Sequence, residues 1–581
     1  MTDRRNVLLC VLLFLAAVVA IDPRLEMGIN DDWAFTRICR EFAATGHIAY
    51  NGWEAPALVP QIVWGAVFVR LFGFSFFVVR MSTVLLTVLL IPVLYRLAKE
   101  SGLQPDFAAF AALLTVLSPL MLPLELSFMS DVPAFVLFVF CLYAGVRAWR
   151  APTVAACAGW AFLISFTGLL GGLNRQIYWV APLLFLPTIG WVQRRTLARR
   201  AVINGAAMVF GATWIFTCAA VFGCLRWVQA QPYILSENWR QGWENGGLRI
   251  LASQEILLAA KVAATLALLL IPILAGFLVP GLRSAGRTAT ILASAAALAA
   301  GFGGLQWQTV RFPWLQNLLT QYGAVPVGVT ISAPPLVLGP TLQDAIAMIV
   351  TFCCACGGLA LWKLRKPAGA PPPGALTPVP VMALGAVFTA GWLAVILLRS
   401  PGTPAYDRYV ISLLPLFAIP LLQFFQVHIS SRISRLSWVG LAVFACYGVA
   451  VTHDAFSGGR ARLAAAQALE RTGISRTEIA AGLDYDGETQ IEAQGYVNNP
   501  KISNPPDAYH LAECTNSPYP LLMWYFPKMT ALRARYFIFL SHVPPMPDGP
   551  VGPIPYTTWL PPARRHVYTH MVPGSKSIGC Y

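Results

Sequence analysis

Long apolar runs, separated by short polar segments, fill the chain from its start to Val451. About thirteen of these runs have a plausible length for a membrane-spanning helix, which needs roughly 20 mainly apolar residues. They are residues 6–21, 77–95, 107–123, 133–148, 154–171, 177–192, 201–224, 256–279, 288–304, 345–362, 379–398, 410–425 and 438–451. The pattern predicts an all-α polytopic membrane protein.

A further apolar run, residues 57–72, is short, is interrupted by Pro60, and carries Trp64 and Arg70. These features favour a helix that lies at the membrane interface over one that crosses. If this run does not cross, the clusters of Lys and Arg in the remaining loops all fall on one side of the membrane. Because basic residues collect in short cytoplasmic loops, we predict a cytoplasmic N-terminus.

The tail after Thr452 lies outside in this topology. It is polar, rich in Pro and Asn, and contains an amphipathic stretch at 460–471 and a strand-like run at 536–540. We therefore predict two parts: a membrane domain at 1–452 and a small extracytoplasmic α+β domain at 453–581.

Composition supports the membrane assignment. Apolar residues make up 57% of the chain and charged residues only 12%, whereas a soluble chain has about 25% charged residues. The net charge of +15 does not indicate nucleic-acid binding, because the basic residues sit in short clusters between apolar runs. The twelve cysteines show no zinc-binding spacing, and no metal ligand is predicted. Cys514 and Cys580 are candidates for a disulfide in the exported tail.

Two of the predicted outer loops contain acidic residues directly before a predicted helix. Asp31 and Asp32 precede an amphipathic stretch, and Asp131 precedes an apolar run in the sequence Ser-Asp-Val-Pro. One explanation is helix capping, since Asp accepts backbone N–H bonds at a helix start. The other is catalysis: a carboxylate just above the membrane could act as a general base, and acids at the hydrocarbon boundary are costly.

Two arginines stand at the outer ends of predicted spans. Arg175 occupies a short turn between two apolar runs, and Arg408 is followed by Tyr409 at the start of another. The side chains could snorkel to lipid headgroups. Alternatively, they could hold a lipid phosphate, because the planar guanidinium suits bidentate phosphate recognition.

The order of these motifs resembles the GT-C superfamily of membrane glycosyltransferases, in particular the branch with protein O-mannosyltransferases and the aminoarabinose transferases that modify lipid A. An acidic pair (Asp31, Asp32) is followed by Arg40-Glu41 and Gly46, and a second apolar helix ends in Leu-Phe-Gly at 71–73. Ser130-Asp131-Val132-Pro133 is similar to the family's TD-x-P motif, Asn174-Arg175-Gln176 to its basic turn, and Arg408-Tyr409 with Leu414-Pro415 to its late RY-x-x-x-LP run. A Lys-Pro-Pro or His-Pro-Pro element of many members is replaced by Glu54-Ala55-Pro56.

The resemblance implies an inverting glycosyltransferase of the bacterial inner membrane, with an active site on the outer face. Its donor would be a sugar on polyprenyl phosphate, and its acceptor a lipid, a glycan or a protein. Asp31 would be the base, and Asp131 a second catalytic residue that orients the acceptor or helps to position Asp31. Asp32, Arg175, Arg408 and Tyr409 would bind substrate. No cofactor is implied with certainty, and a divalent cation remains open.

Two other classes of protein share parts of this pattern. A lipid-linked glycan flippase or transporter would place ionisable groups near the middle of its helices, whereas Lys261 is nearly alone in such a position here. A polysaccharide polymerase would carry a long outer loop rich in Arg, which the sequence lacks. The glycosyltransferase is therefore the preferred interpretation, and neither sugar nor acceptor can be named from the sequence.

Overall fold

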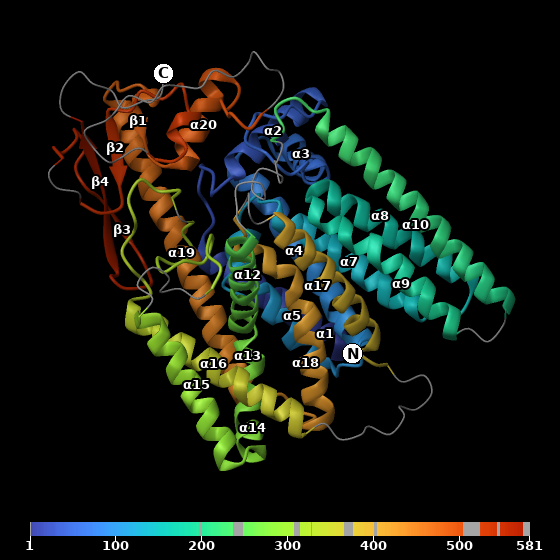
Figure 1. Ribbon diagram of the computed structural model, residues 1–581. Helices are drawn as coiled ribbons and strands as arrows, with labels where there is room; N and C mark the ends of the chain where they lie inside the picture. Colours follow the sequence, from blue (N-terminus) through green and yellow to red (C-terminus); the bar gives the residue numbers. More distant parts are fainter. Residues whose placement is uncertain are drawn as a thin grey trace.

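The computed structural model describes residues 2–196, 200–235, 248–306, 314–326, 328–364, 376–399, 404–502, 523–542 and 546–572. Most of these residues are helical, and Figure 1 shows a bundle of long helices with a small sheet at one corner. The predicted fold class, a polytopic α-helical membrane protein with a small C-terminal α+β part, is confirmed.

The helices that precede the sheet include short 3₁₀ segments, which carry the letter η. They are α1 (Thr2–Ile21), α2 (Asp32–Thr45), α3 (Val59–Phe72), α4 (Phe76–Glu100), α5 (Pro105–Val116), α6 (Met121–Glu125), α7 (Asp131–Trp149), α8 (Val154–Asn174), η1 (Gln176–Trp179), α9 (Val180–Thr196), α10 (Arg200–Gln229), α12 (Leu248–Leu269), α13 (Ile271–Leu274), η2 (Ala275–Phe277), α14 (Leu278–Ser284), α15 (Arg287–Gln306), α16 (Pro340–Lys363), α17 (Val379–Arg399), η3 (Asp407–Leu413), α18 (Leu414–His428) and α19 (Arg435–Arg471).

The predicted spans coincide with helices of the structure. Within the described residues, nine helices are long and apolar enough to cross a membrane. A tenth crossing results if the pair Ser253–Leu269 and Ile271–Ser284, bent by 63°, forms one broken span. Of the other three predicted spans, 177–192 overlaps α9 and 288–304 overlaps α15, whereas 107–123 is divided between the short helices α5 and α6. The chain is therefore a multi-pass membrane protein.

The run predicted to lie at the interface forms α3, a separate helix of 14 residues. Pro60 stands in its first turn, where the missing N–H leaves no hydrogen bond unmade. Helix α2 ends at Gly46, whose φ of 77° is left-handed and favours glycine. The two helices pack on each other, and Figure 1 shows them at the end of the bundle that also carries α20 and the sheet.

The C-terminal part consists of a four-stranded sheet and short helices. These elements are η4 (Arg476–Glu478), β1 (Ile479–Ala480), α20 (Leu483–Gln494), η5 (Phe526–Lys528), β2 (Tyr536–Phe539), β3 (Ile554–Thr557) and β4 (Arg564–Met571). The strand order is β1-β2-β4-β3, with β1 parallel to β2 and the other pairs antiparallel. The strand predicted at 536–540 is β2.

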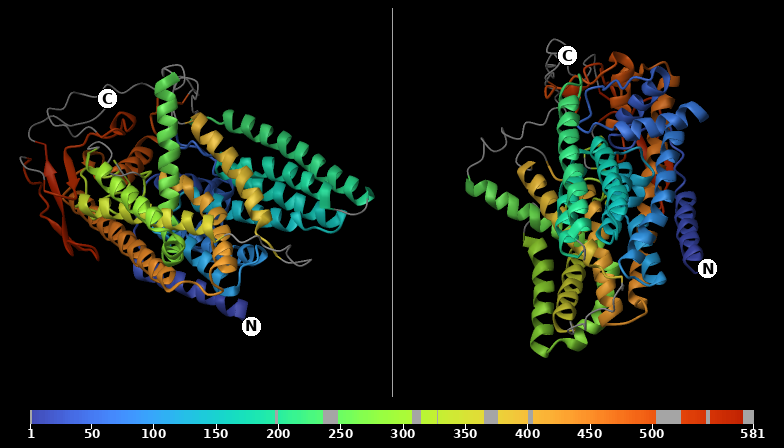
Figure 2. Two further views of the ribbon diagram at one scale, coloured as in Figure 1. Left: turned by 60° about the horizontal axis from the view of Figure 1, so that its bottom comes forward. Right: turned by 90° about the vertical axis from the view of Figure 1, so that its right-hand side faces the viewer.

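Helix α19 joins the two parts of the chain. Its 37 residues run without a break through position 452, where the sequence predicts the domain boundary. Helix α19 packs on α1 and α13 of the bundle and on β3 and β4 of the sheet, with Gly440 against Pro272 of α13 and Gly458 near Tyr556 of β3. Figure 2 shows this helix running along the bundle and continuing to the sheet. The C-terminal part is thus attached to the bundle by a continuous helix.

A buried arginine shapes the loop that leads to α2. Arg80, near the start of α4, is 1% exposed. Its guanidinium donates hydrogen bonds to the backbone carbonyls of Leu25 and Met27. Both terminal nitrogens of this buried arginine are thereby bonded to loop carbonyls, and the bonds fix the segment that precedes Asp31.

Candidate active site

Four of the predicted site residues, which are far apart in the sequence, come together in the structure. Asp31 directly precedes α2, and Asp131 is the first residue of α7. Arg175 directly follows α8, and Arg408 lies in η3, ahead of α18. The ends of four helices therefore supply two acids and two arginines to one site.

Arg408 joins the two carboxylates. Its Nη2 lies 3.6 Å from Asp31 Oδ2, and its Nη1 lies 3.6 Å from Asp131 Oδ2. Arg175 Nη1 donates a hydrogen bond to the other oxygen of Asp131. Asp131 is 3% exposed and contacts both guanidinium groups, so its charge is neutralised within the site.

Asp31 stands at the N-cap position of α2, but its side chain makes no capping hydrogen bond. Its Oδ1 accepts a hydrogen bond from the indole Nε1 of Trp53, at 2.9 Å. The side chain is 22% exposed, against 15% for Arg175 and 9% for Arg408. Of these groups, the Asp31 carboxylate is the one that a ligand from outside can best reach.

Asp32 performs a different task. It is 1% exposed, and its two oxygens accept hydrogen bonds from the backbone N–H groups of Ile29, at 2.5 Å, and Phe128, at 3.1 Å. Burial raises the pKa of Asp32 to about 6, against the lowering effect of the Arg80 charge and these two bonds. Its carboxylate is thus directed to the chain itself and ties the loop before α2 to the loop before α7.

Aromatic rings orient the arginines. The Arg175 guanidinium lies 4.4 Å from the centroid of the Tyr409 ring, and Arg408 lies 5.1 Å from that of Tyr406. The two tyrosines are in edge contact. Cation–π contacts of this kind hold a guanidinium without consuming its N–H donors. Tyr409, predicted to bind substrate, therefore lies beside the site and supports Arg175.

Polar side chains next to the site tie its helices together. Asn174 donates from Nδ2 to the Ser130 carbonyl at 2.9 Å, and its Oδ1 accepts from the backbone N–H of Gln61 at 3.2 Å. Asp407 is 1% exposed and accepts from the backbone N–H of Leu319 at 2.7 Å. The residues beside Asp131, Arg175 and Arg408 are therefore held by hydrogen bonds to other segments.

The C-terminal part adds residues that the sequence did not reveal as site residues. Trp53 lies between Trp33 and Trp524, with ring centroids 5.3 and 5.8 Å away. The Lys528 ammonium stands 5.4 Å from the centroid of Trp53 and 4.9 Å from that of Trp524. Because Trp53 also donates to Asp31, Lys528 is brought to the edge of the acid–arginine cluster.

The environment of Lys528 changes its titration. Burial lowers the pKa of this lysine to about 8, Lys501 contributes in the same direction, and the Asp31 charge opposes both. The ammonium is thus close to losing its proton in mildly alkaline solution. The sequence offered no pattern that marks Lys528, because its role depends on the packing of η5 against the first loop.

The charges of the site nearly cancel. The two carboxylates of Asp31 and Asp131 balance the two guanidinium groups of Arg175 and Arg408. Lys528 adds a positive charge at neutral pH. One further negative charge, such as that of a phosphodiester, would therefore balance the charges of the site.

Two predictions concern other groups. Cys514 and Cys580 lie outside the described residues, so the predicted disulfide remains a prediction.

Within the described part of the chain, the one group of three His, Cys, Asp or Glu side chains close enough to share a metal ion lies in the C-terminal sheet. It consists of His542, Asp548 and His570, none of which the sequence analysis singled out.

Comparison with known families supports the resemblance stated above. Residues 56–223 match the family described as dolichyl-phosphate-mannose-protein mannosyltransferase. Over this segment, which is less than a third of the chain, the protein is similar to membrane mannosyltransferases. The matched segment contains Asp131, Arg175 and helix α3, and thus part of the acid–arginine cluster.

Two solved structures are also similar, at a low level. One is ArnT from Cupriavidus metallidurans bound to undecaprenyl phosphate, with 16% identity, a TM-score of 0.38, and coverage of 80% of this chain and 72% of that one. The other is the same protein in the apo state, with 17% identity, a TM-score of 0.29, and coverage of 72% and 77%. Both TM-scores lie below 0.5, and we draw nothing further from them. A comparison with curated proteins found no match.

Proposed function

We propose that this protein is a glycosyltransferase that moves a sugar from a polyprenyl-phosphate donor to a hydroxyl group of a lipid, glycan or protein acceptor, with inversion at the anomeric carbon. The observation that carries the proposal is the cluster in which the partly exposed Asp31 carboxylate stands beside Arg408 and, through Asp131, Arg175. One bound donor would thereby contact both the proposed base, Asp31, and the two arginines that would bind its phosphate.

The arginines and Lys528 would bind the donor phosphate. A phosphodiester carries one negative charge, and more charge develops on the departing phosphate as the glycosidic bond breaks. Fixed positive groups aimed at that charge are the main source of catalysis in such a reaction. Arg175 and Arg408 are held by Asp131 and by tyrosine rings, so they are oriented before the donor arrives.

Asp31 would act as the base. The acceptor oxygen attacks the anomeric carbon from the face opposite the phosphate, and its proton passes to the Asp31 carboxylate. The bond between the anomeric carbon and the phosphate oxygen breaks, and its electron pair leaves with the polyprenyl phosphate. Asp131 is assigned a positioning role, because both of its oxygens face arginines, and Asp32 fixes the loop that carries Asp31.

The lipid chain of the donor requires an apolar path next to the site. Helix α3 offers one, since Val63, Val67, Leu71 and Phe72 are between 45% and 70% exposed. The helix also contacts α8, whose end carries Arg175. A polyprenyl chain lying on α3 would therefore bring its phosphate toward the arginines.

We further propose the orientation that the basic clusters predict. The N-terminus would face the cytoplasm of a bacterium, and the site with the C-terminal part would face outward across the inner membrane. In this orientation the sugar is carried to the site by polyprenyl phosphate, and no nucleotide sugar is required on the outer side. Transfer would take place on the side of the membrane where glycans, lipids and exported proteins can serve as acceptors.

Donor binding tests the proposal. Affinity of the purified full-length protein for polyprenyl phosphate would be measured by native mass spectrometry in detergent micelles. Arg175→Gln should weaken binding about tenfold or more, because it removes a charged hydrogen bond to the phosphate. The matched control is Arg24→Gln, since Arg24 is 77% exposed and pairs with Asp22 outside the proposed donor path. Equal affinity of Arg175→Gln and wild type would refute the assigned phosphate site.

Mass spectrometry of surface glycolipids and glycoproteins from a deletion strain would identify the substrates. A single missing sugar mass would name both the sugar and the acceptor. An unchanged surface composition, with the gene normally expressed in the parent strain, would argue against a transferase that acts outside.

A further inference from the structure

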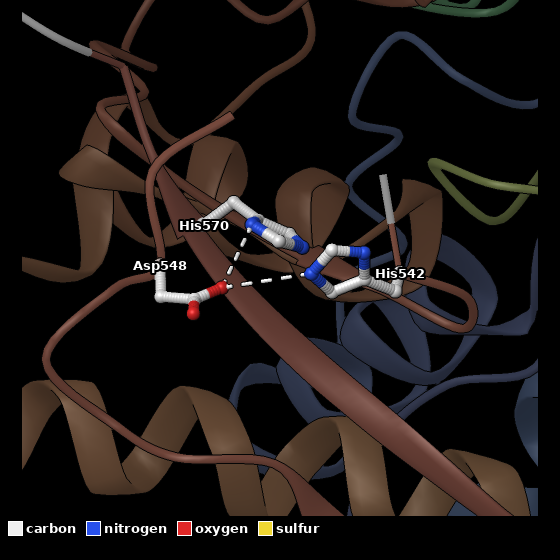
Figure 3. Close-up of side chains that lie close together, drawn as sticks. All are labelled: His542, Asp548 and His570. Atoms are coloured by element: carbon white, nitrogen blue, oxygen red, sulfur yellow. Dashed lines mark ion pairs between the residues drawn. The ribbon is translucent and has the colours of Figure 1, made fainter. Parts of the chain in front are cut away.

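Three side chains of the C-terminal sheet converge at a place unrelated to the sugar chemistry. His570 stands on β4, His542 follows β2, and Asp548 lies in the segment between β2 and β3. Figure 3 shows the two imidazole rings and the carboxylate pointing toward one another. Asp548 Oδ1 lies 3.5 Å from His570 Nδ1 and 4.0 Å from His542 Nε2.

The backbone fixes this arrangement. The Gly549 N–H donates to the Thr569 carbonyl at 2.8 Å, and the Met571 N–H donates to the Pro547 carbonyl at 3.0 Å. These two bonds flank Asp548 and hold it opposite His570 in an antiparallel bridge. The meeting of Asp548 and His570 therefore follows from the pairing of their backbone segments.

His570 is the decisive residue. Its side chain is fully buried, and neither of its ring nitrogens has a hydrogen-bond partner among the described residues. A buried polar group without a partner costs about 1–3 kcal/mol, so such groups in native proteins require an explanation. Its Nδ1 faces the exposed Asp548, its ring contacts that of His542, and a ligand between the three side chains would supply the missing partner.

We propose that His542, Asp548 and His570 bind a divalent transition-metal ion, for which zinc is the best fit. The three ligand atoms lie within 4.8 Å of one another. Tetrahedral zinc, with bonds of about 2.0–2.1 Å, brings its ligand atoms to about 3.3 Å apart. His542 and Asp548 are 51% and 79% exposed and can rotate by the small amount required.

The donor set also selects the class of metal. Calcium and magnesium prefer oxygen ligands throughout, whereas two imidazoles with one carboxylate suit zinc and its neighbours in the first transition series. Three protein ligands leave a coordination position for water on the exposed side. The metal would join the segment between β2 and β3 to β4 and so stabilise the C-terminal part.

Metal analysis of the full-length protein tests this proposal. The protein is purified with an affinity tag that contains no histidine, because a polyhistidine tag would itself bind zinc. After chelation, equilibration with Zn²⁺ and removal of the excess, the wild type should retain one zinc ion per chain that resists exchange with Mg²⁺. His542→Ala and Asp548→Asn should each weaken zinc binding by about tenfold or more. Both residues are exposed, so these substitutions leave the buried packing intact.

His566→Ala is the matched control, because His566 is an exposed histidine on the same strand β4. It should bind zinc as the wild type does. Zinc should also raise the melting temperature of the wild type and of His566→Ala, but not that of His542→Ala or Asp548→Asn. Equal zinc content and equal melting shifts in all four proteins would overturn the proposal, whatever their transferase activity.

Discussion

Asp31 and Asp131 show how neighbouring carboxylates can take different roles in one site. Asp131 is almost fully buried and contacts two arginines, so its charge is already compensated. Asp31 is more exposed, accepts one indole hydrogen bond and has a single arginine at 3.6 Å. An acceptor hydroxyl can therefore reach the Asp31 carboxylate more easily than that of Asp131, and for this reason we assign the base to Asp31.

Lys528 gives the site a predicted pH dependence. Its pKa is lowered to about 8, mainly by burial, so its positive charge is present at neutral pH and is lost as the pH rises through 8. The KM for the donor should therefore rise above that pH. Lys528→Gln should show a KM raised about tenfold at neutral pH, with no further rise, because one charged contact is already missing.

Lys501→Gln serves as the control for this titration. Lys501 lowers the pKa of Lys528, so its removal should move the rise in KM to higher pH without changing the neutral value. The measurement is the donor KM from pH 6.5 to 9.5. A flat profile in the wild type would remove Lys528 from the phosphate site.

Sequence motifs could predict the residues that stand at helix ends but not those that reach the site through packing. Asp31, Asp131, Arg175 and Arg408 each occupy a polar break between apolar runs, where a charged side chain is conspicuous. Lys528 lies in an ordinary polar segment, and only the packing of Trp524 on Trp53 brings it to the site. Asp32 was predicted to bind substrate from its position beside Asp31, whereas its burial could not be seen in the sequence.

At the scale of elements, the end of α8 is held by a close contact. Gly172 lies against the Trp179 ring, where an added Cβ would approach the ring to 1.9 Å. Only glycine fits there. The contact brings α8 and η1 together and so sets the direction of the turn that carries Arg175.

Gly172→Ala should therefore destabilise the protein by about 1–3 kcal/mol, the usual cost of overpacking, and should reduce transfer by displacing Arg175. Gly159→Ala on the same helix is the control, because nothing lies within 4 Å of its added Cβ. It should be neutral or slightly stabilising, since alanine is the better helix former. Equal melting temperatures of the two variants would contradict the assigned contact.

Apolar periodicity predicted the helices well, because long apolar runs have few alternatives in a membrane. It also separated α3 from the crossing helices by its length, Pro60 and Arg70. The sequence could not show that α19 continues past Val451, because its amphipathic far part looks like the start of an independent domain. The sheet order depends on pairings between distant segments, which local patterns do not encode.

At the scale of the whole molecule, the account depends on which side the site faces. His47 on the loop after α2 and Arg471 at the end of α19 are exposed, and Arg432 lies before the start of α19. In a protein with Cys446, Cys514 and Cys580 replaced by Ser, a membrane-impermeant thiol reagent should label His47→Cys and Arg471→Cys in intact cells. Arg432→Cys should react only after the membrane is opened. The reverse pattern would invert the orientation and place the site in the cytoplasm.

The most direct test of the central claim is the transfer rate of Asp31→Asn with purified donor and the acceptor identified from the deletion strain. Asparagine caps a helix as well as aspartate and can still accept the Trp53 hydrogen bond, but it cannot take a proton. The rate constant for transfer should fall by about 10² to 10⁴-fold, while melting and donor affinity are not weakened. Asp22→Asn, which alters an exposed carboxylate paired with Arg24 in the same loop, should transfer at the wild-type rate. If Asp31→Asn also transfers at that rate, Asp31 is not the base and the proposed mechanism is wrong.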